Sequence, residues 1–273
     1  MYDLKDKIVL VTGASKGIGA HFVREILEEG VEHVRILDVD VGSGVLLQDE
    51  LNEKYGEDKV KFVKCDVTND DQFYKALEDA KEDKGYIDLL VNNAGVADES
   101  KLTLIRRLIE INYIALINGT LKAIELMRKD NGGRGGAVIN VSSIGGLIQV
   151  SPMFTYSSSK RAVMQFSHCV GQAPCARTGV RVLAICIGVT DTAILGKIKC
   201  IEKRLDLEAQ NVLGEHPVQN AQSAARGMID MFKQGESASI WLVRANEPAE
   251  DITSHILKAD ADIAKVIAGP SSE

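Results

Sequence analysis

The chain has 273 residues, of which 45% are hydrophobic and 26% charged, as expected for a folded domain with a large core and not for a disordered chain. Its formal net charge of −7 offers no basic surface, so neither nucleic acid nor an anionic membrane is an expected partner. The five cysteines are scattered and form no CxxC pair or Cys/His cluster, which predicts reduced thiols and no metal site.

Apolar strands alternate with amphipathic helices through the first half of the chain. Lys7–Thr12 reads KIVLVT, a continuous apolar run typical of a parallel strand buried on both faces. Ile18, Phe22 and Ile26 then recur at helical spacing. The same patterns predict further strands at Val34–Leu37, Val60–Lys64 and Ile87–Val91, and helices at Gly17–Glu29, Val45–Tyr55 and Asp70–Lys81.

The second half continues this alternation as far as Asp191. A long helix over Leu102–Arg128 and a glycine-rich loop over Gly132–Gly136 come first. Pro174 is expected to end or kink the helix that precedes it. The other predicted elements are strands at Ala137–Val141, Val180–Ile185 and Ser239–Val243, and helices at Met153–Ala173 and Ala221–Lys233.

Repeated strand–helix–strand units predict an α/β fold, with a doubly wound parallel sheet of about seven strands, right-handed crossovers and helices on both faces. No repeat, low-complexity tract or linker interrupts the chain, so residues 1–273 are predicted to form a single domain. Residues 193–216 are expected to form either a mobile substrate lid or an ordinary surface helix pair. Residues 246–273 are a tail that either wraps a partner subunit or frays.

Directly after the first predicted strand, residues 12–19 read TGASKGIG. Glycines permit a tight turn and a close approach of the backbone to a pyrophosphate, and the following helix offers free N–H groups and its positive dipole end. A glycine-rich turn without a ligand is the alternative, but the strand–loop–helix context favours dinucleotide binding. The expected contacts are Thr12, Gly13, Ser15, Lys16, Gly17, Ile18 and Gly19.

The spacing TGxxxGxG in this loop resembles that of the short-chain dehydrogenase/reductase family, which implies a Rossmann-type fold and a nicotinamide cofactor. Asp38 ends the second predicted strand, where a carboxylate can hydrogen-bond the adenosine ribose and repel a 2′-phosphate, so we expect NAD. Lys16 argues the other way, because in the family a basic residue before the second glycine often accompanies NADP. A helix N-cap is the alternative role for Asp38.

Two further motifs follow the third and fourth predicted strands. The sequences Cys65-Asp66-Val67 and Asn92-Asn93-Ala94-Gly95 resemble the family's adenine-side and strand-stabilising motifs. By this resemblance, Asp66 hydrogen-bonds the adenine amino group. The asparagine side chains could instead satisfy backbone groups where the strands end. The residues expected to lie against the cofactor here are Asp66, Val67, Asn93, Ala94 and Gly95.

Tyr156 and Lys160 stand at positions i and i+4 of a predicted helix and therefore share one face. A free tyrosine is a poor base at neutral pH, but a nearby ammonium lowers its pKa, so Tyr156 could take the hydroxyl proton of an alcohol. A YxxxK pair alone is also common in amphipathic surface helices. Ser143 ends the fifth predicted strand and matches the family's serine, which hydrogen-bonds the substrate oxygen. The resemblance also implies that Lys160 holds the nicotinamide ribose.

Asn112 lies within the long predicted helix, where asparagine is mildly unfavourable. In the family, an asparagine here holds a water in a proton relay to the lysine, and a helix–helix hydrogen bond is the alternative. The implied catalytic set is Asn112, Ser143, Tyr156 and Lys160. After the sixth strand Ile187 replaces the family's usual proline. The cofactor contacts expected in this loop are Gly188, Thr190 and Thr192.

The resemblance covers about residues 5–243 and is nearest to the insect-type alcohol dehydrogenases and the 15-hydroxyprostaglandin dehydrogenases. Both sub-families are NAD-linked and use secondary alcohols. The implied function is NAD-dependent oxidation of an alcohol, secondary or apolar, to a ketone or aldehyde. Two alternatives stay open: an NADPH-dependent carbonyl reductase, supported by Lys16, and a cofactor-binding scaffold without turnover. The resemblance further implies a homodimer or homotetramer formed through Leu102–Arg128 and Met153–Ala173.

Ligands of open α/β sheets bind beyond the carboxyl ends of the strands. Side chains expected there favour a small-molecule alcohol or ketone with an apolar body. The candidate substrate contacts are Ser143, Leu147, Gln149, Met153, Tyr156, Ile194 and Leu195. The first residues show no signal-peptide pattern, and no apolar run reaches the length of a membrane span, so we expect a cytoplasmic protein with no membrane partner.

Overall fold

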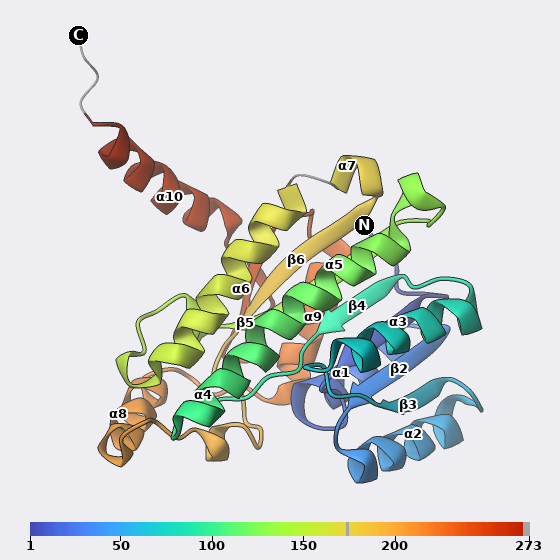
Figure 1. Ribbon diagram of the computed structural model, residues 1–273, viewed down its shortest axis with the longest axis horizontal. Helices are drawn as coiled ribbons and strands as arrows, with labels where there is room; N and C mark the ends of the chain where they lie inside the picture. The colour runs from blue at the N-terminus through green and yellow to red at the C-terminus, as the bar shows by residue number, and fades with distance from the viewer. Residues whose placement is uncertain (173–174, 270–273) are drawn as a thin grey trace.

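The computed structural model describes residues 1–172 and 175–269, so the break expected at Pro174 lies outside the described residues. The described strands form one sheet in the order β3-β2-β1-β4-β5-β6-β7-β8. Strands β1 to β7 are parallel, and β8 is antiparallel to β7. Helices cover both faces of this sheet (Figure 1). The predicted doubly wound α/β fold is therefore confirmed, with β8 as one additional edge strand.

The strands are β1 (Ile8–Thr12), β2 (His33–Asp38), β3 (Val60–Lys64), β4 (Leu89–Asn92), β5 (Gly136–Ser143), β6 (Val180–Ile187), β7 (Ile240–Val243) and β8 (Glu250–Asp251). The α-helices are α1 (Gly17–Glu28), α2 (Val41–Tyr55), α3 (Asp70–Lys84), α4 (Leu102–Ile109), α5 (Ala115–Met127), α6 (Phe154–Gln172), α7 (Cys175–Thr178), α8 (Lys203–Gly214), α9 (Ala221–Gln234) and α10 (Thr253–Ala268).

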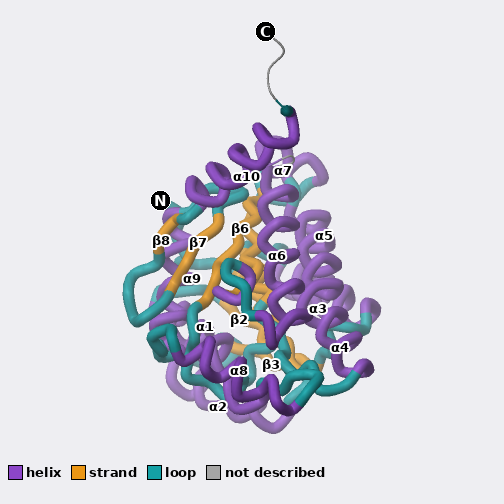
Figure 2. The backbone as a smooth tube through the Cα atoms, turned by 90° about the vertical axis from the view of Figure 1, so that its left-hand side faces the viewer, coloured by secondary structure: helices purple, strands orange, loops and turns teal. Residues whose placement is uncertain are grey.

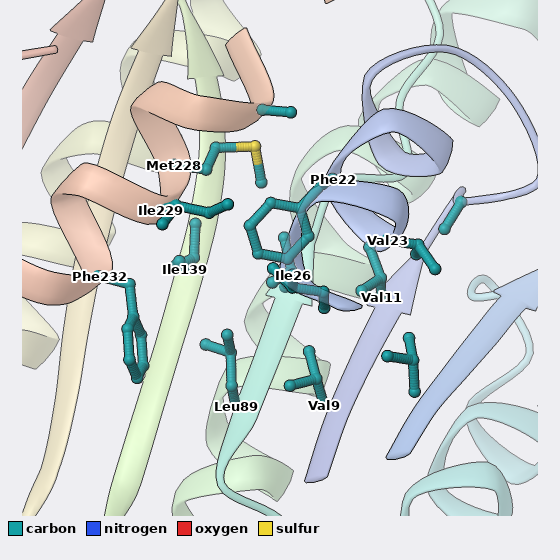
Figure 3. Close-up of a cluster of buried hydrophobic side chains, with 14 of the residues drawn as sticks. Val9, Val11, Phe22, Val23, Ile26, Leu89, Ile139, Met228, Ile229 and Phe232 are labelled. Carbon is teal, nitrogen blue, oxygen red and sulfur yellow. The ribbon is translucent and has the colours of Figure 1, made fainter. Parts of the chain in front are cut away.

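Apolar clusters on the two faces of the sheet hold the helices in place. On one face, Phe22 of α1 and Met228 of α9 pack over Val9, Leu89 and Ile139 of the central strands, as Figure 3 shows. On the other face, side chains of α3 and α5 pack over β1, β4 and β5. Because the central strands are buried on both faces, their sequences are continuous apolar runs.

The strand order reverses between β1 and β4. The chain runs outward from β1 through β2 to β3, then returns to place β4 on the other side of β1. The loops that leave the carboxyl ends of β1 and β4 therefore run in opposite directions and leave a crevice between them. This crevice is where the sequence predicts the ligand.

The long helix predicted over Leu102–Arg128 is interrupted. A π-helical turn, η1 (Glu110–Ile114), separates α4 from α5 and contains Asn112. Asn112 is fully buried, and its side chain pairs with the backbone of Val96 in the loop after β4. A π-turn inserts one extra residue into a helix and is common at functional sites. Because the hydrophobic periodicity continues across such a turn, periodicity alone predicts one continuous helix here.

The lid and tail regions are mostly helical. Residues 193–216 contain a short 3₁₀ turn, Leu195–Lys197, and helix α8. The tail forms β8 and then α10, which stands off the rest of the molecule in Figures 1 and 2 and has no buried residue. Within the described part of the chain, no helix is both long and apolar enough to cross a membrane.

Candidate active site

A cavity of about 740 Å³ opens at the carboxyl ends of the central strands, a size typical of small-molecule and cofactor sites. Most of the predicted cofactor contacts line it: Gly13, Ser15, Lys16, Gly17, Ile18, Asp38, Asp66, Val67, Asn93, Ala94, Gly95, Gly188, Thr190 and Thr192. Six of the predicted catalytic and substrate residues line it as well: Ser143, Met153, Tyr156, Lys160, Ile194 and Leu195. One cavity thus joins the glycine loop to the tyrosine and lysine.

The glycine loop leaves its backbone open toward the cavity. Gly13 has φ +62°, and a Cβ atom there would lie 2.7 Å from the Cα of Ala94. Gly17 has φ +58°, also a conformation that favours glycine. The buried Oγ of Ser15 has no hydrogen-bond partner among the residues that the structure describes. An unpaired buried hydroxyl beside two such glycines fits a ligand with hydrogen-bonding oxygens, such as a diphosphate.

Thr12 and Gly19, two of the residues predicted to contact a cofactor, do not line the cavity. The Oγ1 of Thr12 accepts hydrogen bonds from the N–H groups of Asn93 and Ala94, both at 3.0 Å. The Nδ2 of Asn93 donates to the carbonyls of Thr12 and Gly13 at 2.9 and 3.0 Å. A Cβ on Gly19 would lie 2.8 Å from the Cα of Ala14. These residues shape the loop by tying β1 to the turn after β4.

Asp38 fixes the far end of the glycine loop. Its Oδ2 accepts from the N–H of Ser15 at 2.9 Å, and its Oδ1 accepts from the N–H of Asp40 at 3.0 Å. The N-cap of α2 is Asp40, whose Oδ1 accepts from the N–H of Ser43, so the alternative of Asp38 as the cap does not hold. Lys16 pairs with Asp40 at 2.7 Å. That pairing is the main reason that the pKa of Asp40 falls to about 2.

Asp66 lines the cavity just after β3 and is held there by its neighbours. Its Oδ1 accepts from the N–H and hydroxyl of Thr68, and its Oδ2 accepts from Arg107 of α4 at 3.0 Å. Burial acts to raise the pKa of Asp66, but hydrogen bonds from Thr68 and Arg107 outweigh it and lower the pKa. Arg107 also lines the cavity and was not predicted, because arginines on a helix surface carry no motif.

Ser143 and Tyr156 meet across the cavity. Both side chains line the cavity, and Gly145 lies beside both. A Cβ on Gly145 would be 3.6 Å from the Oγ of Ser143 and 3.5 Å from the ring of Tyr156. Burial raises the pKa of the Tyr156 phenol, and the hydrogen bond from Ser143 offsets only part of this rise. The two hydroxyls together can hold one oxygen of a ligand.

Lys160 lies one helical turn after Tyr156 and is buried. Its Nζ donates to the carbonyl of Val141 at 2.9 Å and lies 5.8 Å from the centre of the Tyr156 ring. Burial lowers the pKa of Lys160 to about 8. Lys160 is not among the groups that shift the pKa of Tyr156 in this arrangement, since its Nζ is directed at the Val141 carbonyl.

Asn112 lies next to Gly95 and does not itself line the cavity. Its Oδ1 accepts from the N–H of Val96 and its Nδ2 donates to the carbonyl of Val96, both at 2.9 Å. Its Nδ2 also lies 3.4 Å from the Oγ of Ser159. The side chain of Asn112 therefore links the loop after β4 to helix α6, close to Lys160.

Glu99 is a buried carboxylate that sequence reasoning missed. It is 1% exposed, and its two oxygens accept the N–H groups of Thr155 at 3.1 Å and of Tyr156 at 2.5 Å. Its own N–H donates to the carbonyl of Lys199 at 2.7 Å. A carboxylate is favourable at the positive end of a helix, so Glu99 stabilises the start of α6 and ties it to residues 198–200. A lone acidic residue in a loop gives no sequence signal for this role.

Gln219 was also missed. Its Nε2 donates to the hydroxyl of Thr190 and to the carbonyl of Val243, both at 3.2 Å. Backbone hydrogen bonds join Gln219 to Val189 and Asp191 on either side of Thr190. The hydroxyl of Thr190 donates to the carbonyl of Gly188. Gln219 thus fixes the loop after β6 although Ile187 replaces the proline expected there.

The cavity is apolar next to Tyr156, and two of the residues predicted to contact a substrate there do not line it. Leu147 packs instead against Met164 and Ile240 behind β6, and Gln149 is exposed and does not line the cavity. The cause is the 3₁₀ turn Ile144–Gly146, which changes the direction of the chain after Ser143. The apolar residues that line the cavity on this side are Val150, Met153, Ile194, Leu195, Ile198 and Leu213.

Comparisons with known proteins agree with this geometry. A family model described as short chain dehydrogenase matches residues 7–202. The NAD(+) 15-hydroxyprostaglandin dehydrogenase of Macaca fascicularis is 37% identical over 194 residues, covering 71% of this chain and 71% of that protein. Alcohol dehydrogenase 2 of Ceratitis cosyra is 32% identical over 251 residues, covering 87% of this chain and 95% of that protein.

A solved structure shares the fold. The crystal structure of levodione reductase aligns with a TM-score of 0.76 at 21% identity and covers 89% of this chain and 97% of that chain. The family resemblance expected from the motifs is confirmed by these matches.

Proposed function

The chain belongs to the short-chain dehydrogenase family, and from that premise we propose that it is an NAD-dependent dehydrogenase that oxidises an apolar or secondary alcohol to a ketone or aldehyde. The observation that carries this proposal is the meeting of Ser143, Tyr156 and Lys160 in one cavity with the glycine loop. The relatives support the direction of the reaction, since their names describe an NAD(+) dehydrogenase and an alcohol dehydrogenase.

The described residues fit a dinucleotide. The glycine loop with the unpaired Oγ of Ser15 would hold the diphosphate, and Asp38 would accept from the adenosine ribose. Asp66 and Arg107 would lie against the adenine, and Thr190 and Thr192 against the nicotinamide; all four line the cavity. When bound, NAD⁺ supplies the acceptor for the hydride that leaves the alcohol carbon.

Tyr156 takes the hydroxyl proton of the alcohol in this proposal. The bond that breaks is the alcohol O–H, and the proton goes to the phenolate oxygen of Tyr156. Burial opposes formation of the phenolate, so a positive charge is required nearby. Lys160 supplies it once its Nζ turns from the Val141 carbonyl toward the phenol, a rotation within one side chain. Ser143 holds the alcohol oxygen and stabilises its developing charge.

The substrate is an alcohol with an apolar body. Val150, Met153 and Ile198 supply an apolar wall next to Tyr156. Burying a side chain-sized apolar group against such a wall contributes about 1.5–3 kcal/mol to binding. Lys197 and Lys199 are exposed at the rim of the same cavity. Because the wall next to Tyr156 is apolar, we expect longer apolar secondary alcohols to be better substrates than short primary ones.

The test is a panel of alcohols, short and long, primary and secondary, assayed with NAD⁺ and with NADP⁺ by the absorbance of the reduced cofactor. The proposal expects turnover with NAD⁺ and a higher kcat/KM for the longer secondary alcohols. Reduction of ketones with NADPH and no oxidation with NAD⁺ would support the carbonyl reductase instead. Binding of a dinucleotide with no turnover on any alcohol or ketone would support the scaffold.

Assembly through the long helices remains part of the proposal. Ile114 of η1 and Leu121 of α5 are 45% and 51% exposed, whereas Leu116 and Val163 are buried in the chain's own core. Ile114 and Leu121 are therefore available to contact a second copy of the chain, whereas Leu116 and Val163 are not. Sedimentation of the purified protein tests the expected homodimer or homotetramer, and a monomer at all concentrations would contradict it.

A further inference from the structure

Lys16 stands at the end of the cavity where an adenosine ribose would lie, yet it is not a free cation. Its Nζ lies 2.7 Å from the Oδ2 of Asp40, and both side chains line the cavity with Asp38. Lys16 is 67% exposed and Asp40 39% exposed. A lysine at this place would otherwise be suited to a phosphate group, which it binds as a point charge.

Asp40 is held in place by contacts other than Lys16. Its Oδ1 accepts from the N–H of Ser43 at 3.1 Å, and its Oδ2 accepts from the hydroxyl of Ser43 at 3.1 Å. Its own N–H donates to Asp38. A helix N-cap is a fixed position, so the carboxylate stays beside Lys16 without depending on the ion pair.

We propose that Asp40 is a specificity-determining residue, which neutralises Lys16 and thereby makes the adenosine ribose subsite select NAD over NADP. This inference rests on the proposed function, because it concerns the cofactor of that same site. Asp38, Asp40 and Lys16 all line this end of the cavity, where Asp40 pairs with Lys16 and leaves the carboxylate of Asp38 without a neutralising partner in that pair. A 2′-phosphate entering there meets a net negative charge and must compete with Asp40 for Lys16.

The contribution of this pair should appear in cofactor selection rather than in stability. Both groups are substantially exposed, and exposed ion pairs contribute little to the free energy of unfolding. A phosphate carries more negative charge than the single carboxylate it would displace, so freeing Lys16 changes the affinity for NADP⁺ far more than the affinity for NAD⁺.

The decisive variant is Asp40→Asn. Asparagine is an equally good N-cap, so α2 keeps its first hydrogen bond from Ser43 while the charge on Lys16 is released. Calorimetric titration of each variant with NAD⁺ and with NADP⁺ measures the two dissociation constants without relying on turnover. The inference expects affinity for NADP⁺ to rise about threefold to tenfold, and affinity for NAD⁺ to change less than about twofold.

Two further variants complete the test. Lys16→Met in the Asp40→Asn background should remove the gain for NADP⁺, because the gain requires the freed ammonium. Asp79→Asn breaks the Lys75–Asp79 pair at 2.8 Å on α3, far from the subsite, and should change neither affinity. An unchanged ratio of the two affinities in Asp40→Asn, with NAD⁺ still bound by the wild type, would overturn this inference alone. A wild type that binds neither dinucleotide would overturn the proposed function as well.

Discussion

Replacing Glu99 tests how the tyrosine-bearing helix is positioned. The Glu99 carboxylate accepts two N–H groups at the start of α6, one of them the N–H of Tyr156 itself. Hydrogen bonds to a buried charged group contribute about 1.5–3 kcal/mol each, so Glu99→Ala should lower the free energy of unfolding by about 3–6 kcal/mol. Glu99→Gln keeps one accepting oxygen and should cost about 2 kcal/mol.

Thermal unfolding measures this loss directly. For a chain of this size, about 2 kcal/mol corresponds to a fall of about 4–8 °C in the melting temperature for Glu99→Gln. The matched control is Glu53→Gln on the exposed surface of α2, which should leave the melting temperature unchanged within error.

Kinetics separate a positioning role from a purely structural one. If Glu99 orients Tyr156, then Glu99→Gln should lower kcat for alcohol oxidation about tenfold or more while the affinity for NAD⁺ is retained. Glu99→Asp, which keeps the charge on a shorter stem, should recover part of kcat. Loss of stability with an unchanged kcat would refute the positioning role, and an unchanged melting temperature in Glu99→Ala would refute the hydrogen-bond reasoning itself.

Three other predictions concern the cavity. Because burial lowers the pKa of Lys160 to about 8, the Tyr156–Lys160 pair loses one proton as the pH rises through about 8, and the form in which Lys160 keeps the remaining proton holds the Tyr156 phenolate that accepts the alcohol proton. We therefore expect kcat/KM for alcohol oxidation to rise, and kcat/KM for ketone reduction to fall, as the pH increases through about 8; pH profiles without these opposite trends would contradict the pairing. At Gly13, φ is +62°, and an added Cβ would lie 2.7 Å from the Cα of Ala94. Gly13→Ala should therefore abolish NAD⁺ binding measured by calorimetry and lower the free energy of unfolding by about 1–3 kcal/mol. Retained binding would refute the role of the glycine loop in holding the diphosphate. Met153 lines the cavity and Leu147 does not, so Met153→Ala should raise KM for long apolar alcohols without affecting NAD⁺ affinity, and Leu147→Ala should leave KM unchanged. A raised KM in Leu147→Ala with an unchanged KM in Met153→Ala would show that the substrate does not bind beside Met153.

Much of the architecture could be predicted from local patterns. Central strands such as β1 and β6 are buried on both faces, so their continuous apolar runs identify them without tertiary information. The π-turn at η1 and the two-residue strand β8 could not be predicted in this way, because each depends on contacts with distant segments: Asn112 with Val96, and β8 with β7. Helix α10 was not predicted, because its N-cap residue is Ile252, which gives no sequence signal for the start of a helix.

Motifs that fix both residue type and spacing predicted residues that the fold brings together. Gly13, Ser15, Lys16, Gly17 and Ile18 of the glycine loop line one cavity with Ser143, Tyr156 and Lys160. Leu147 and Gln149 do not line the cavity, and nothing in the sequence reveals the 3₁₀ turn after Ser143 that directs them elsewhere. Groups that act through the fold, such as Glu99 and Asp40, were not identified, because their partners are far away in sequence or their role depends on a neighbour's charge.

The central claim is that the phenol of Tyr156 exchanges the proton of the alcohol. Formation of NADH from the best alcohol of the panel should be compared for the wild type, Tyr156→Phe and the control Tyr74→Phe on α3, with NAD⁺ affinity measured for each by calorimetry. Tyr156→Phe should lose about 10²–10⁴-fold in kcat and still bind NAD⁺, with Tyr74→Phe unaffected. A Tyr156→Phe variant that forms NADH at the wild-type rate would contradict the claim.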